Sequence, residues 1–209
     1  VHLTGCPSYD NLFSLSSTNS WVELEVAKIV EHAQVQIKPR AYKLVLMHPV
    51  TDSVLSDTNV FEVLISALFR SKRPTVLFYP NVDPGNKTMI QILHKYQKAA
   101  ADWASWLRIL THVPSKVFMT LMKEATVMLG NASAGIRESC VFGTPTLNLG
   151  SRQLGRRTPQ NVTSLVSPTE AQILDWLALH DKYMRYPPSE MYGSSNSSQR
   201  IASILADET

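Results

Sequence analysis

Residues that could bind an anion are gathered in one stretch, GNASAGIRESCVFGTPTLNLGSRQLGR, from Gly130 to Arg156. Its small residues follow a predicted strand and let a ligand approach the backbone at a helix start, where free N–H groups favour phosphate. Ser133 adds a hydroxyl donor, and Arg152 follows the next predicted strand. Glu138 would repel a phosphate beside it, but its carboxylate suits a sugar hydroxyl. The stretch therefore predicts a site for an anion that carries a sugar. The alternative is a capped helix in a small-residue turn, since a single glycine-containing turn is a weak motif.

Polar side chains also follow the other predicted strands. His48 lies near the end of YKLVLMHPV, Asn81 and Asp83 near the end of PTVLFYPNVD, and His112 near the end of WLRILTHV. Ligands of parallel sheets bind outside the carboxyl ends of the strands, so we expect these side chains beside the anion site. For His48 and His112 the alternative is a histidine that only satisfies nearby backbone groups.

Alternating strands and helices must position these residues. Short apolar runs predict strands at 42–50, 74–83, 106–113, 126–131, 144–150 and 161–166. Helical spacing and capping residues predict helices that begin at Ser56 or Asp57, at Asn86 and at Pro114. Two more helices are predicted over 134–142 and 198–206, and another follows a capping box at 167–170. This alternation predicts an α/β fold with a parallel sheet covered by helices on both faces.

The composition excludes several classes of protein. The chain has 209 residues, 44% of them hydrophobic, which suits one large domain. The net charge of +3 comes without a Lys/Arg block, so nucleic acid is not an expected partner. No apolar run approaches the roughly 18 residues of a membrane helix. Cys6 and Cys140 form neither a disulfide framework nor a metal motif, so we expect a reducing, cytoplasmic setting, no metal and no cofactor, with Cys140 in the core.

Three segments together resemble the hydrolysing UDP-N-acetylglucosamine (UDP-GlcNAc) 2-epimerases, the type fused to a kinase in animal sialic-acid synthesis. They are TGCPSYD at 4–10, HPVT at 48–51 and the long stretch from Gly130. FYPNVDPGNK, HVP and MYGSSNSSQRI follow the same order, so the resemblance covers nearly the whole chain. It implies a three-layer Rossmann-like domain, one half of a GT-B-like two-domain fold, with residues 1–209 as the C-terminal UDP-binding domain. Because the sequence already reads as mid-domain at Val1, we expect an N-terminal half that is absent from this chain.

The resemblance also implies roles for particular residues. His48 lies in the cleft, contacts the substrate and is the catalytic candidate of this half, while Asn81 lines the UDP site and the backbone at Val113 lies near uracil. The remaining nucleotide contacts are implied for Ser133 at the diphosphate, Glu138 at the ribose hydroxyls and Arg152 nearby.

Two departures from the family pattern concern affinity and regulation. Ala132 stands where family members often have a second serine, which removes one hydroxyl from the diphosphate site. Lys87 and His112 match part of the basic cluster that binds the feedback inhibitor, a cytidine-activated sialic acid, in the animal enzymes. Gln91 and Thr111 occupy positions where further basic residues are expected. The cluster is therefore incomplete.

The implied reaction converts UDP-GlcNAc and water into N-acetylmannosamine and UDP. UDP is eliminated to leave a glycal, and water then adds with inversion at C2. The main acid and base carboxylates come from the N-terminal half, so we expect this chain alone to bind UDP but to turn over little substrate. The expected partners are UDP-GlcNAc, UDP and further copies of the chain in a homo-oligomer. The alternatives are a non-catalytic UDP-sugar-binding or regulatory module, and a glycosyltransferase half-domain, which HPVT together with GIRE disfavours.

Overall fold

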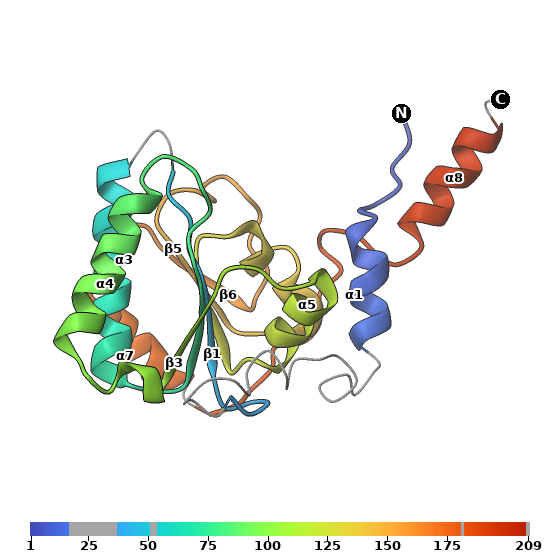
Figure 1. Cartoon of the computed structure of the whole chain (residues 1–209). Helices are drawn as coiled ribbons and strands as arrows, with labels where there is room; N and C mark the ends of the chain where they lie inside the picture. The colour runs from blue at the N-terminus through green and yellow to red at the C-terminus, as the bar shows by residue number, and fades with distance from the viewer. Residues whose placement is uncertain (17–36, 51–53, 181, 208–209) are drawn as a thin grey trace.

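A parallel sheet forms the centre of the computed structural model, which describes residues 1–16, 37–50, 54–180 and 182–207 (Figure 1). Its strands are β1 (Lys43–Leu46), β2 (Thr75–Phe78), β3 (Leu107–Leu110), β4 (Val127–Gly130), β5 (Thr146–Leu149) and β6 (Val162–Leu165), in the order β3-β2-β1-β4-β5-β6. Leu46 pairs with Phe78 on one side and with Gly130 on the other, so the carboxyl ends of these strands meet at one edge. The strand order reverses between β1 and β4, and ligands bind beside such a switch point in open α/β sheets.

Helices cover both faces of the sheet (Figure 1). One face carries α3 (Val54–Ser71), α4 (Asn86–Ala99) and α7 (Glu170–Leu179), and the other carries α5 (Ser115–Glu124), α6 (Ser139–Phe142) and α1 (Ser8–Ser16). The last helix, α8 (Ser197–Asp207), extends away from the sheet beyond α1 (Figure 1). This arrangement confirms the predicted three-layer α/β fold.

Alternating strand residues supply two separate cores. Leu44 and Met128 are buried with the side chains of α1, α5 and α6. Val45 and Leu129 are buried with those of α3, α4 and α7. Successive side chains of a strand point to opposite faces, so strands covered on both sides read as continuous apolar runs. Cys140 is 0% exposed in the first of these cores, as predicted.

Two helices begin elsewhere than predicted. Helix α3 starts at Val54, before Ser56 and Asp57, and the residue that precedes it lies outside the described part of the chain. The capping box of α7 is formed by Thr169 and Gln172 rather than by Ser167 and Glu170. Both pairs fit the same sequence pattern. The carboxylate of Glu170 instead accepts hydrogen bonds from side chains of α3, including Arg70 Nη1 at 2.9 Å.

The segment predicted as one helix over 134–142 is broken. A single 3₁₀ turn, Ser133–Gly135, is followed by the four-residue helix α6. The hydroxyl of Ser139 donates to the carbonyl of Gly135 at 2.8 Å, a side-chain bond that competes with regular helix formation. Gly143 ends α6 with φ 63°, and a Cβ there would lie 1.9 Å from the carbonyl oxygen of Tyr186. The segment is therefore a compact turn beside the sheet edge.

Candidate functional site

A hydrogen-bond network joins the loops that follow β1, β2 and β4. Asn131, which is 0% exposed, accepts from the N–H of His48 with Oδ1 at 2.8 Å and donates to its carbonyl with Nδ2 at 2.7 Å. The N–H of Asn81 donates to Nδ1 of His48 at 3.2 Å. Gln153, after β5, donates with Nε2 to the carbonyl of Asn131 at 2.8 Å. The structure therefore brings His48 and Asn81 into direct contact at the predicted edge of the sheet, and Asn131 and Gln153 hold the backbone behind His48.

The imidazole of His48 is half-buried among charged neighbours. Burial lowers the pKa of His48 from its usual value, Arg152 lowers it further through its positive charge, and Asp83 acts in the opposite sense. The neutral form of His48 is therefore favoured. Arg152 itself is exposed, and its effect on His48 places its charge at this edge of the sheet.

Several buried side-chain oxygens accept no hydrogen bond from the part of the chain that the structure describes, among them Oδ1 of Asn148 and Oε1 of Gln153, and two belong to residues predicted to bind the ligand. These two are Oδ1 of Asn81 and Oε2 of Glu138. The amide nitrogen of Asn81 donates to Asp83, which leaves the oxygen as the unused end. Burial raises the pKa of Glu138, with Arg137 and Arg156 opposing the effect. Buried acceptors without partners cost free energy, so both oxygens suit hydrogen-bond donors of a ligand.

A tight turn after β4 offers backbone donors. Gly130 has φ 132°, and a Cβ there would lie 2.0 Å from the carbonyl oxygen of Leu46, so only glycine fits beside β1. The N–H groups of residues 135–138 donate back into the turn. Those of Ser133 and Ala134 make no hydrogen bond among the described residues. The predicted helix dipole is weaker than expected because the helix is broken, so an anion here would rely on these N–H groups and the Ser133 hydroxyl.

An apolar pocket of about 210 Å³ opens beside the carboxyl ends of β1, β2 and β3. Its lining residues are Leu46, Phe78, Thr111, His112, Val113 and Phe118. The rings of Phe78 and Phe118 meet edge to face with centroids 5.6 Å apart. Val113 is buried and His112 is exposed at the rim. A flat heterocycle is the kind of group that such a pocket accommodates.

Lys87 and His112, the two residues of the predicted regulatory cluster, each follow the carboxyl end of a strand, β2 and β3 respectively. Lys87 is exposed on the first turn of α4, in the layer formed with α3. His112 instead lines the apolar pocket after β3. Their shared regulatory role stays a prediction.

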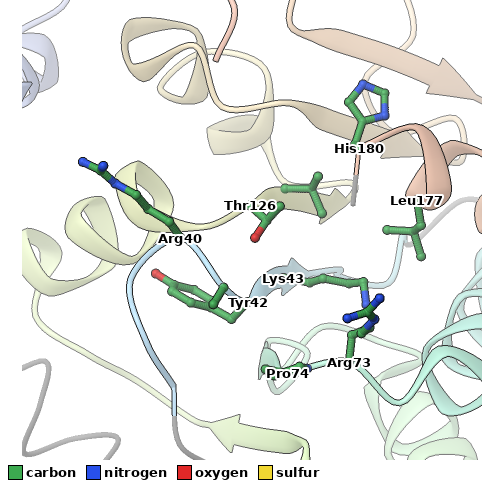
Figure 2. Close-up of a pocket in the computed structure, with 10 residues that line it drawn as sticks. Arg40, Tyr42, Lys43, Arg73, Pro74, Thr126, Leu177 and His180 are labelled. Carbon is green, nitrogen blue, oxygen red and sulfur yellow. The ribbon is translucent and has the colours of Figure 1, made fainter. Parts of the chain in front are cut away.

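A second cavity, of about 220 Å³, lies at the opposite edge of the sheet, before β1, β2 and β4 (Figure 2). Its basic lining residues are Arg40, Lys43, Arg73 and His180. Arg40 pairs with Glu124 at 3.2 Å, and Nδ1 of His180 lies 2.8 Å from the carbonyl oxygen of Trp176. None of the residues predicted to bind a ligand lines this cavity.

Neither a metal site nor a membrane helix is found in the part of the chain that the structure describes. No three His, Cys, Asp or Glu side chains of residues 1–16, 37–50, 54–180 and 182–207 come close enough to hold an ion. The helices within the same ranges are too short or too polar to cross a bilayer.

Solved structures share this fold at low sequence identity. The UDP-GlcNAc 2-epimerase of Neisseria meningitidis, determined with UDP-GlcNAc bound, superposes with a TM-score of 0.67 and 15% identity, covering 98% of this chain and 55% of its own. Heptosyltransferase II of Escherichia coli, a GT-B protein, matches with a TM-score of 0.53 and 12% identity over 75% of this chain and 50% of its own. The domain is therefore one half of a GT-B-like fold.

Sequence comparison is more specific. The hydrolysing UDP-N,N'-diacetylbacillosamine 2-epimerase of Legionella pneumophila is 31% identical over 164 residues, which are 78% of this chain and 41% of that relative. The chain thus spans well under half the length of this relative. The family model described as UDP-N-acetylglucosamine 2-epimerase matches residues 1–206, almost the whole chain. On this match the chain belongs to the UDP-N-acetylglucosamine 2-epimerase family, as the sequence motifs suggested.

Proposed function

We propose that this chain is the UDP-binding half of a hydrolysing UDP-GlcNAc 2-epimerase. One observation carries the proposal. A pocket of base size, a turn with unused N–H groups and a buried acceptor carboxylate lie along the same carboxyl edge of the sheet. They correspond to the three parts of UDP, which are uracil, diphosphate and ribose.

The apolar pocket is the proposed place of the uracil ring. Phe78 and Phe118 supply aromatic surface, and Val113 lines the same pocket, where its backbone is the proposed polar contact of the ring. Aromatic and apolar walls with a few polar groups are typical of sites for flat ligands.

The diphosphate and the ribose are proposed to bind at the turn after β4. The N–H groups of Ser133 and Ala134, with the Ser133 hydroxyl, donate to phosphate oxygens, and the cationic Arg152 supplies opposite charge from the next loop. The orphaned Oε2 of Glu138 accepts from the ribose hydroxyls. A neutral hydroxyl satisfies that oxygen without bringing negative charge beside it.

In the proposed reaction His48 contacts the substrate from this half of the cleft. UDP leaves by elimination to give a glycal, water adds with inversion at C2, and the products are UDP and N-acetylmannosamine, a precursor of sialic acid. The proton transfers need carboxylates placed on the far side of the cleft, which we assign to the part of the relatives' length that this chain does not span. The chain alone should therefore bind UDP and release almost no N-acetylmannosamine.

Calorimetric titration of UDP into the purified chain tests this proposal. Glu138→Ala removes the ribose acceptor and should weaken binding about tenfold or more, because hydrogen bonds to charged groups contribute about 1.5–3 kcal/mol. Glu62→Ala is the matched control, since Glu62 lies on α3 and pairs with Lys95 on α4, at 2.8 Å. Saturable binding that is lost only in Glu138→Ala supports the proposal. A folded chain that does not bind UDP, or binds it equally in all three proteins, contradicts it.

A further inference from the structure

The side chain of Asn131 extends the pairing of β1 and β4 beyond the ends of both strands. The backbone ladder stops at the pair Leu46 and Gly130. Asn131 directly follows Gly130, and its carboxamide bonds to both the N–H and the carbonyl of His48, two residues beyond Leu46, at 2.8 and 2.7 Å. The Asn131 side chain thus makes the two hydrogen bonds that a neighbouring strand would make. These bonds fix the backbone of His48, the residue proposed to contact the substrate.

The ring of His48 is fixed from the other side. Nδ1 accepts a hydrogen bond from the N–H of Asn81 at 3.2 Å, so Nδ1 carries a lone pair and the proton of the neutral ring is on Nε2. Nε2 makes no hydrogen bond to the described part of the chain. The tautomer is therefore set by a backbone group of the loop after β2, and it leaves a donor available to a ligand.

Asn131 is itself held in place. It is 0% exposed, and its carbonyl accepts from Nε2 of Gln153 at 2.8 Å. The chain of contacts from Gln153 through Asn131 and His48 to Asn81 links the loops after β5, β4, β1 and β2. A shift of the His48 backbone would lengthen the bond between Nδ1 and the Asn81 N–H, because that bond joins two different loops.

We propose that Asn131 is a positioning residue that holds His48 against the Asn81 N–H, so that His48 presents an Nε2–H donor to the substrate. Asn131 touches no substrate atom in this role and acts through the backbone of His48. The nature of the acceptor rests on the proposed function: it is an oxygen of an anionic nucleotide sugar. A donor fixed in direction before binding loses little freedom when the ligand arrives.

The tautomer of His48 can be measured by ¹⁵N NMR of the histidine rings in the free chain. We expect the wild-type ring to be protonated at Nε2 and unprotonated at Nδ1 above pH 7. Asn131→Asp keeps the acceptor for the His48 N–H but replaces the donor to the His48 carbonyl with a repelling oxygen. It should move the Nδ1 and Nε2 signals of His48 toward a mixture of tautomers and weaken UDP-GlcNAc binding about tenfold.

Asn161→Asp is the matched control for loss of a buried amide. Asn161 is 4% exposed, and its Nδ2 donates to Ser139 and to the carbonyl of Thr144, away from His48. It should lower stability without changing the His48 signals. If Asn131→Asp fails to fold, Gln153→Ala removes the bond that holds Asn131 and should shift the same signals by a smaller amount.

The proposal is overturned if the wild-type ring carries its proton on Nδ1, or if the folded Asn131 or Gln153 variant leaves the His48 signals unchanged. The tautomer measurement needs no ligand. Failure of the wild-type chain to bind UDP-GlcNAc would therefore count against the proposed function, while the ring signals would still decide the role of Asn131.

Discussion

Replacing Glu138 with glutamine should stabilise the free chain and at the same time weaken UDP binding. Oε2 of Glu138 is buried and accepts no hydrogen bond within the described residues, and burial raises the pKa of this carboxyl. A carboxyl whose pKa is higher in the folded than in the unfolded state binds protons more tightly when folded. Its contribution to stability therefore falls as the pH rises from the unfolded pKa through the folded pKa. At pH 7 the buried, ionised carboxylate of Glu138 lowers the free energy of unfolding, and a neutral amide avoids this penalty.

The contacts of Glu138 give the expected size of both the gain in stability and the loss of UDP affinity. A buried polar group without a partner costs about 1–3 kcal/mol, and an amide of the same size still leaves polar atoms there, so the gain should be about 1 kcal/mol. In a chain of this length that corresponds to a rise of roughly 2–4 °C in Tm. The lost charge-assisted bonds to ribose should reduce the affinity for UDP by about ten- to a hundredfold.

Urea unfolding at pH 7 and pH 5, with calorimetry of UDP binding, measures both effects. The stability gain of Glu138→Gln should shrink at pH 5, where the wild-type carboxyl is more protonated. Glu124→Gln is the control, because this buried carboxylate is paired with Arg40 at 3.2 Å and lies at the other edge of the sheet. It should lower stability and leave UDP affinity unchanged. A Glu138→Gln chain that is less stable and binds UDP normally would refute the reasoning.

Three further changes test other parts of the site. Gly130→Ala should cost more than about 3 kcal/mol in urea unfolding, because its Cβ would lie 2.0 Å from the carbonyl oxygen of Leu46 at φ 132°; an unchanged midpoint would contradict this. Ser133→Ala should weaken UDP binding about five- to tenfold in calorimetry through one lost hydrogen bond and leave uridine binding unchanged; an equal loss for both ligands would place the hydroxyl elsewhere. Arg152→Gln should raise the pKa of His48 in an NMR titration, because it removes one lowering influence, yet burial should keep that pKa below its usual value; a fall in the pKa would be inconsistent with the geometry.

Local sequence patterns were sufficient to predict the strands. Most strands lie in short, largely apolar runs, and β1, β2, β4 and β5 are buried along almost their whole length by helices on both faces. The strand-end residues His48 and Asn81 lie at the expected edge for the same reason, since a parallel sheet gathers the carboxyl ends of its strands. Their roles toward a ligand remain predictions.

Features that depend on distant partners were not predictable. Asn131 and His48 are 83 residues apart, and no local pattern marks an amide that will pair with both backbone groups of a residue in another loop. Phe118 reads as a core residue at helical spacing, yet its ring lines the pocket with Phe78. The capping box of α7 was misplaced because two overlapping patterns fit the sequence, and the carboxylate of Glu170 instead bonds to Ser66 and Arg70 of α3, a contact that no local pattern reveals.

Mapping UDP onto the chain by NMR tests the central claim most directly, because the two edges of the sheet carry separate cavities of similar size. Backbone amide shifts should change on UDP addition at Val113 and over 131–138. The amides around Lys43, Thr126 and His180, at the opposite edge (Figure 2), should stay unchanged. Changes confined to that opposite edge, or no changes in a folded chain at millimolar UDP, would contradict the assignment of the nucleotide to the carboxyl ends of the strands.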